Sequence, residues 1–160
     1  MKLRLTAMAL GLAFGLASAV QAQTPSAAKS DRNAKEAAEE RIEQQYKAAR
    51  EKCNSMQGNA KDICMAEAKG KQKVAKAELD AKDDKDQAKA QRKVAEARAE
   101  AAYDVAKEKC DDQKGEAKDA CVKQARVERD RAKGKAEKTA EAKQEKQSAA
   151  AGGTAPQKQK

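Results

Sequence analysis

The sequence predicts an all-α protein built from two disulfide-stapled helical hairpins in tandem, with an elongated shape. Three observations support this: a segment is repeated, each copy carries two cysteines, and the composition favours helices. Laid over each other at an offset of 57 residues, positions 41–69 and 98–126 agree at 13 of 29 places. Self-similarity at a fixed period indicates one supersecondary unit that is used twice.

The composition predicts helices with narrow seams and provides little material for a large apolar core. Alanine supplies 32 of the 138 residues after position 22, and most of the others are Lys, Glu, Gln, Arg and Asp. Apart from Asp, these residues are strong helix formers. Leu, Ile, Val and Phe total only eight in the same stretch, a fraction typical of disordered chains. We therefore expect a long, largely solvated helical protein without strands.

The first 22 residues have the layout of a secretory signal peptide. Lys2 and Arg4 form a basic start, residues 5–19 carry no charge, and Ala22 is a small residue that suits a cut after it. The apolar run is too short to favour a transmembrane helix; an uncleaved anchor is the alternative. Removing residues 1–22 leaves no expected transmembrane segment and lowers the net charge from +9 to +7. We expect a periplasmic or secreted protein.

Export bears on the four cysteines, because thiols outside the cytosol are usually oxidised. Four cysteines allow three pairings. A unit that was copied intact carries its own bond, which predicts the pairs Cys53–Cys64 and Cys110–Cys121. Zinc binding is the alternative, but the chain has no histidine, and the spacing within each pair is wider than that of a metal hook.

Each disulfide is expected to staple a hairpin just beyond its turn. Gly58 and Gly115 lie midway between the paired cysteines, where a helix can end on a left-handed residue. Asn59 with Asp62 resembles a capping pair at the start of the outgoing helix. For so short a loop, chain entropy gives about 3 kcal/mol of stabilisation per disulfide.

Before the first cysteine of each repeat, small and aromatic residues recur in steps of four and three. Such spacing predicts one helix face that packs on a neighbour. Alanines let two helices approach closely, and each tyrosine is expected to lie across the partner helix; a binding role for the tyrosines is the alternative. The predicted seam residues are Tyr46, Ala49, Tyr103 and Ala106.

The expected elements follow one another without strands. In order, they are a disordered segment 23–30, a hairpin repeat 31–79, a charged linker 80–86, a second hairpin repeat 87–147 and a disordered basic tail 148–160. The two middle helices are expected to form a long central helix, kinked or continuous, which if unbroken is about 80 Å long at 1.5 Å per residue. Clustered aspartates lower helix propensity, which makes the linker the expected position of a kink.

The residues predict no enzyme, cofactor or metal site. Without histidine, a Ser-His-Asp or Cys-His arrangement is impossible, and general acid–base catalysis loses its commonest agent. The cysteines do not form a CxxC pair. The aspartates of the linker would attract a divalent cation, but lysines are interleaved among them and the spacing and glycine of a calcium loop are missing. These aspartates are Asp80, Asp83, Asp84 and Asp86.

The basic charge balance points to polyanions as partners. Export and the lack of aromatic platforms for single strands argue against nucleic acid. Acidic residues are interleaved with basic ones throughout, and no helix has the broad apolar stripe of a membrane-surface helix. A charge excess that only keeps the protein soluble is the alternative.

The repeated unit Tyr-x6-Cys-x4-Gly-x-Ala-Lys-Asp-x-Cys, followed by Ala/Lys/Glu-rich helix, resembles small exported proteins of Gram-negative bacteria. These are labelled TolA-like or cell-envelope-biogenesis proteins, and the resemblance covers roughly residues 39–130. Similarity to TolA itself is limited to the composition of its helical rod. The resemblance implies a role in the cell envelope.

We therefore expect a non-enzymatic periplasmic structural or adaptor protein, which associates with an envelope polyanion or an envelope protein through charged helices. One alternative is a periplasmic stress protectant or holdase-like chaperone. Another is a polyanion- or nucleic-acid-binding protein. The partner and the oligomeric state do not follow from the sequence.

Overall fold

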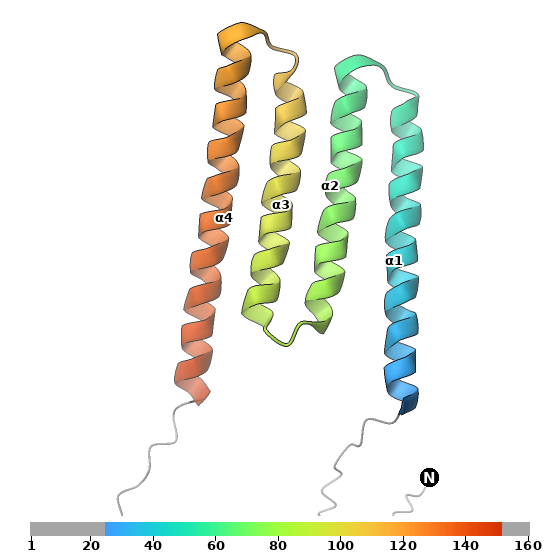
Figure 1. Cartoon of the computed structure of the whole chain (residues 1–160), viewed down its shortest axis with the longest axis vertical. Helices are drawn as coiled ribbons and strands as arrows, with labels where there is room; N and C mark the ends of the chain where they lie inside the picture. Colours follow the sequence, from blue (N-terminus) through green and yellow to red (C-terminus); the bar gives the residue numbers. More distant parts are fainter. Residues whose placement is uncertain (1–24, 152–160) are drawn as a thin grey trace, which may run out of the picture.

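A computed structural model describes residues 25–151 and contains four α-helices in this range. They are α1 (Pro25–Asn54), α2 (Gly58–Asp83), α3 (Gln87–Cys110) and α4 (Gly115–Ala151). No strand occurs among the described residues. Successive helices run in opposite directions along the long axis of the molecule (Figure 1). The prediction of an elongated all-α fold is confirmed.

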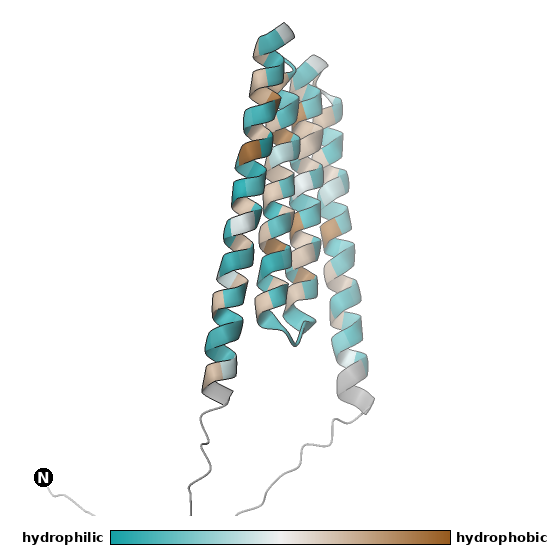
Figure 2. Cartoon of the chain, turned by 60° about the vertical axis from the view of Figure 1, so that its left-hand side comes forward, coloured by the Kyte–Doolittle hydropathy of each residue, from teal (hydrophilic) through white to brown (hydrophobic). Residues whose placement is uncertain are grey.

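The helices form a single open layer. In the described part of the chain, α1 packs on α2, α2 on α3 and α3 on α4, and no other pair of helices is in contact. The two views agree with this row, in which α1 and α4 are the outer edges (Figures 1 and 2). A closed four-helix bundle would bring its first and last helices together around a shared core. Here α2 and α3 have two helical neighbours each, and both broad faces of the layer remain open.

The expected continuous central helix is wrong, because the chain reverses direction between α2 and α3. Helix α2 ends at Asp83 and α3 begins at Gln87. The Asp84 carboxylate accepts a hydrogen bond from the backbone N–H of Asp86 (3.1 Å), and the Asp86 carboxylate accepts one from the N–H of Lys89 (3.0 Å). Aspartate at an N-cap satisfies helix N–H groups that otherwise have no partner. The acidic linker is thus a capped turn rather than a kink.

Two further boundaries differ from expectation. Segment 23–30 was expected to be disordered, but α1 already begins at Pro25. Proline suits the first helical position because its missing N–H would have no partner there. The last helix was expected to end at 147, but α4 continues to Ala151. The expected signal peptide 1–22, residues 23–24 and the tail from 152 to 160 lie outside the described residues.

The buried side chains are few and small. The hydrophobic residues below a tenth exposed are Cys53, Ala68, Leu79, Ala88, Ala90, Ala99, Cys110 and Ala125. Apolar residues occur as isolated patches on otherwise hydrophilic helices (Figure 2). A methyl group added to Gly70 in α2 would lie 2.9 Å from the Cβ atom of Ala101 in α3. The layer is therefore held together by narrow seams in which small residues allow close approach of the helices.

Candidate interaction surface

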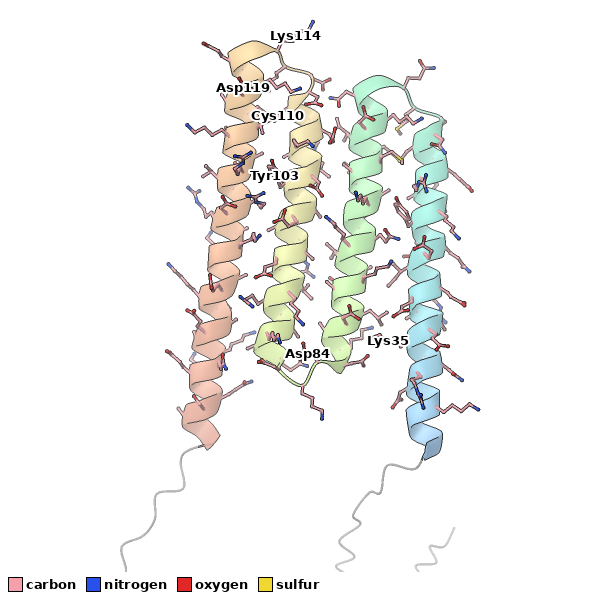
Figure 3. The ribbon with its side chains drawn as sticks, in the orientation of Figure 1. Lys35, Asp84, Tyr103, Cys110, Lys114 and Asp119 are labelled. Carbon is pink, nitrogen blue, oxygen red and sulfur yellow. A yellow bond between two sulfur atoms is a disulfide. The ribbon has the colours of Figure 1, made fainter. Side chains whose placement is uncertain are left out.

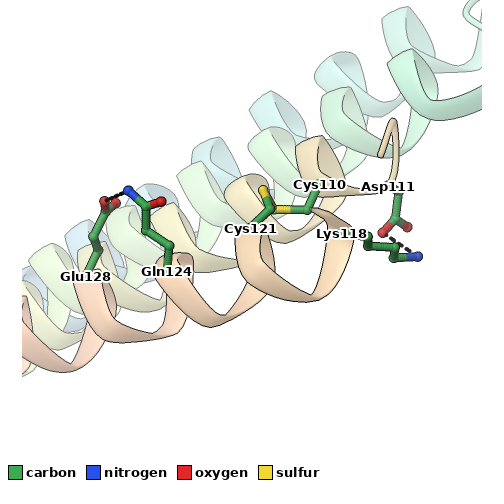
Figure 4. The surroundings of a disulfide bond; sticks show 6 residues. All are labelled: Cys110, Asp111, Lys118, Cys121, Gln124 and Glu128. Carbon is green, nitrogen blue, oxygen red and sulfur yellow. Dashed lines mark hydrogen bonds and ion pairs between the residues drawn. A yellow bond between two sulfur atoms is a disulfide. The ribbon is translucent and has the colours of Figure 1, made fainter. Parts of the chain in front are cut away.

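The two disulfides close the same end of the two hairpins. Cys53 at the end of α1 is bonded to Cys64 in α2, with Cα atoms 5.5 Å apart, and Cys110 at the end of α3 is bonded to Cys121 in α4, with Cα atoms 5.7 Å apart. Cys53 and Cys110 are each only 1% exposed. Figure 4 shows the second bond, close to the ion pair between Asp111, which follows α3, and Lys118 of α4. The predicted pairing is confirmed.

The turn glycines adopt the left-handed conformation but lie elsewhere than expected. Gly58 and Gly115 both have φ of 57°. Each is the first residue of the outgoing helix, α2 or α4, instead of the last residue of the incoming one. Residues with a Cβ atom rarely adopt this backbone conformation. The glycines therefore set the direction in which the outgoing helix begins.

Asn59 does not cap α2 as the sequence suggested. The N-cap position is occupied by Gln57, whose side chain makes no capping hydrogen bond. The side-chain Oδ1 and Nδ2 atoms of Asn59 are buried without a hydrogen-bond partner. A buried polar group without a partner lowers stability. The first repeat therefore contains a polar defect next to its staple, where the second repeat has the exposed Glu116.

The structure places the four predicted seam residues on the first helix of each hairpin, α1 or α3, and each is half-buried. Tyr46 and Ala49 of α1 line a groove shared with Ala68 and Gln72 of α2. In the second hairpin, the guanidinium carbon of Arg129 in α4 lies 4.6 Å from the ring centroid of Tyr103 in α3, a cation–π contact between the helices. Tyr103 is labelled in Figure 3.

In the first hairpin the cation over the tyrosine comes from the same helix. The guanidinium carbon of Arg50 lies 5.5 Å from the ring centroid of Tyr46, one turn away in α1. The two tyrosines, although they are equivalent in the repeat, therefore have different environments. The position equivalent to Arg129 in the first repeat is Gln72, which has no positive charge to place over a tyrosine. Because these two positions were not compared in the sequence, the difference was missed there.

A groove over α2 is shared by the two hairpins. It has a volume of about 450 Å³ and is lined by α1, α2 and α3. Tyr46 and Met65 provide an apolar part, while charged side chains of both signs provide the rest. The lining residues are Tyr46, Asp62, Met65, Ala66, Lys69, Asp104, Lys107 and Glu108. We call this surface the three-helix groove; its chemistry suits a segment with both apolar and charged side chains.

Ion pairs cross all three seams and neutralise part of the surface charge. Lys35 of α1 lies 3.1 Å from Asp80 of α2, and Lys73 of α2 lies 3.3 Å from Asp104 of α3. The pKa of Lys35 is raised, chiefly by its hydrogen bond to Asp80. Charged side chains project from all four helices (Figure 3). The ion pairs bring charges of opposite sign together along the seams.

The outer seam between α3 and α4 uses one glutamate for two cations. Glu100 of α3 lies 2.8 Å from Lys133 and 3.8 Å from Arg129, both in α4. The hydrogen bond to Glu100 raises the pKa of Lys133. The pKa of Arg129 is also raised, chiefly by its hydrogen bond to Asp130. All of these groups remain in contact with solvent, so each pair is a weak contribution to the seam.

The four aspartates of the linker form ion pairs or hydrogen bonds within the protein. Asp80 and Asp83 both pair with Lys35, while Asp84 and Asp86 build the turn. The pKa of Asp84 is lowered, first by the hydrogen bond from the backbone of Asp86 and then by Lys93. In residues 25–151, no group of three or more His, Cys, Asp or Glu side chains is arranged to hold a metal ion.

None of the four described helices is both long and apolar enough to span a bilayer.

Comparisons with protein-family models, with curated proteins and with solved structures gave no match.

Proposed function

We propose that the protein is a non-enzymatic structural or adaptor protein of the periplasm, which contacts envelope components through its charged helical faces. The observation that carries this proposal is the open layer. Because α1 and α4 do not close over a core, α2 and α3 keep surfaces on both faces of the layer that a partner can reach. A scaffold of this kind offers contact area rather than an enclosed site.

The three-helix groove is the proposed place of contact. It combines Tyr46 and Met65 with Lys69 and Lys107. Aromatic and methionine side chains are enriched in protein interfaces, and flanking charges favour specific orientation. An envelope protein with an exposed amphipathic segment meets this chemistry, whereas an anionic envelope polymer would reach the two lysines but also face Asp62, Asp104 and Glu108.

The alternative of a holdase-like chaperone has less support. A holdase needs apolar surface to capture unfolded clients, and contiguous exposed patches mark such surfaces. Among the described residues, the exposed large hydrophobic side chains are Met56 and Val127, which lie in a hairpin loop and in α4 respectively. Polyanion binding without a specific partner is the other alternative, favoured by the net charge alone.

Cosedimentation with purified cell envelopes tests the proposal. The oxidised chain without residues 1–22 is mixed with envelopes over a series of salt concentrations, and the pelleted fraction is measured. We expect retention at low salt, because contact includes charges that salt screens. A protein that stays in the supernatant at every salt concentration would contradict an envelope role and favour the soluble protectant.

A matched pair of variants separates specific contact from net charge. Lys69→Glu with Lys107→Glu changes the groove, and Lys123→Glu with Lys138→Glu makes the same charge change on α4. All four lysines are exposed. The groove variant is expected to lose retention at lower salt than the α4 variant. Equal loss in both would show that net charge alone holds the protein on the envelope.

A further inference from the structure

The turn between α2 and α3 lacks the two devices that fix the other turns. The outer two turns each contain a glycine with φ of 57° and are bridged by a disulfide. The turn at 84–86 contains no glycine, and Asp84 and Asp86 have φ of −77° and −90°, values open to any residue. From Gly70 to Gly115 the sequence has no other glycine and no proline. Nothing in this stretch prevents a continuous helix.

We propose that two copies of this chain exchange their hairpins through this turn. In the exchanged dimer, α2 and α3 of each copy join into one helix over 58–110, roughly 80 Å long at 1.5 Å per residue. The α1–α2 hairpin of one copy then packs on the α3–α4 hairpin of the other. The partner surface is the α2–α3 seam itself, now formed between chains. This inference is independent of the proposed envelope contact.

The seam that would be exchanged is complementary and self-contained. Gly70 lies against Ala101, whose Cβ atom would be 2.9 Å from a methyl group added at Gly70. Lys73 is 3.3 Å from Asp104 on one side of this contact, and Arg98 is 2.5 Å from Glu78 on the other. In the described part of the chain, α2 and α3 are the only helices that connect the hairpins. Opening the turn therefore frees one complete seam, and a second copy restores every contact in it.

Backbone hydrogen bonds favour the straightened turn. At a helix end, the last carbonyl and first N–H groups lack partners within the helix. Here side chains satisfy part of the end groups. The Asp86 carboxylate accepts from Lys89 N–H, the Asp84 carboxylate accepts from Asp86 N–H, and the Gln87 side-chain amide donates to the carbonyl oxygens of Asp84 (2.7 Å) and Ala81 (3.5 Å). A continuous helix supplies these partners by itself. The added backbone hydrogen bonds offset part of the translational and rotational entropy that two chains lose when they associate. We therefore expect the fraction of dimer to increase with protein concentration.

Hinge variants with a matched control test the exchange. Asp84→Ala with Asp86→Ala removes the cap and the turn bond and replaces two poor helix formers. In each chain, we expect the equilibrium between the turn and the continuous helix to shift about tenfold towards the continuous helix. Because the dimer contains two chains, its dissociation constant should fall about a hundredfold. Asp111→Ala with Asp112→Ala makes the same composition change in the loop that Cys110–Cys121 bridges, and is expected to leave the constant unchanged. Sedimentation velocity of oxidised protein over a concentration series measures both.

A cross-link across the seam shows whether a dimer is exchanged. Light and ¹⁵N-labelled chains are mixed in denaturant without reductant, refolded and separated by size. A carbodiimide then joins the Lys73 amine to the Asp104 carboxylate. After proteolytic digestion, the masses of the cross-linked peptides are measured by mass spectrometry. We expect mixed-isotope peptides in the dimer fraction and only like-isotope peptides in the monomer fraction. A hinge variant that stays monomeric like its control, or a dimer without mixed peptides, would overturn the proposal.

Discussion

Replacing Gly70 with alanine is expected to leave stability unchanged or to lower it, although the residue lies inside a helix. Elsewhere, glycine to alanine in a helix interior adds about 1 kcal/mol of stability. At Gly70 the new methyl group would lie 2.9 Å from the Cβ atom of Ala101. That carbon is fixed to the backbone of α3, so relief requires the two helices to move apart. Overpacking of this kind costs about 1–3 kcal/mol, which cancels or exceeds the gain.

Gly134 in α4 provides the matched control. It also lies inside a helix, but a methyl group there would have no atom within 4 Å. Gly134→Ala should therefore show the full gain of about 1 kcal/mol. The free energies of unfolding of the two variants should differ by about 1–3 kcal/mol, which is the cost of the contact with Ala101.

Thermal unfolding of the oxidised protein, followed by circular dichroism at helix wavelengths, measures this difference. Gly134→Ala is expected to raise the midpoint by about 4 °C, whereas Gly70→Ala should leave it unchanged or lower it by several degrees. A second substitution, Ala101→Gly, should restore stability to Gly70→Ala by removing the opposing methyl group. Equal increases for Gly70→Ala and Gly134→Ala would refute the close α2–α3 approach.

Three further predictions follow from the staples, the polar defect and the turn. Replacing Cys53 and Cys64 together by serine should lower the free energy of unfolding by about 3 kcal/mol, measured by urea titration, since the bond closes a short loop; a loss below about 1 kcal/mol would argue against chain entropy as its main effect. Asn59→Ala should raise stability by about 1 kcal/mol in the same titration, because a buried amide without a partner is removed, and a comparable decrease would mean that the amide is satisfied. Folding lowers the pKa of Asp84 from its ordinary value of 3.8, so its contribution is present above that pH and is lost as the pH falls through the lowered value. The melting temperature of Asp84→Asn should therefore fall less steeply below about pH 4 than that of the unmodified protein, and identical slopes would contradict this role.

The sequence predicted the staples and helices because they depend on local information. Two copies of one cysteine spacing select one pairing, and an Ala/Lys/Glu-rich chain without strand signals leaves only helices. The positive φ of Gly58 follows from the same local chemistry. Its place at the start of α2 does not, because either side of a short loop can accommodate a left-handed residue.

The reversal at 84–86 was missed because it depends on tertiary contacts. Local propensity alone allows α2 and α3 to continue as one helix. Clustered aspartates are as compatible with a kink in that helix as with a reversal of the chain. What the turn gains is the seam around Gly70 and Ala101, which lie 31 positions apart and meet only when the chain folds back. Gly70 inside an alanine-rich helix was the available signal, since glycine allows another helix to come close. However, Gly134 lies inside α4, where an added methyl group would have no atom within 4 Å, so the residue type alone does not mark a close approach.

The open layer underlies both the proposed contact and the proposed exchange, and the distance between its two edges tests it most directly. Spin labels can be attached through unnatural amino acids at the exposed positions Glu36 in α1 and Glu141 in α4, which leaves the four cysteines paired. Neighbouring helix axes lie about 8–10 Å apart, so three seams in a row separate the edges by roughly 25–30 Å. Pulsed electron resonance on the monomer fraction, diluted with unlabelled protein, should give a distribution centred near this separation. A distribution centred at about 10 Å, the spacing of adjacent helices, would mean that α1 packs on α4 in a closed bundle and would contradict the open layer.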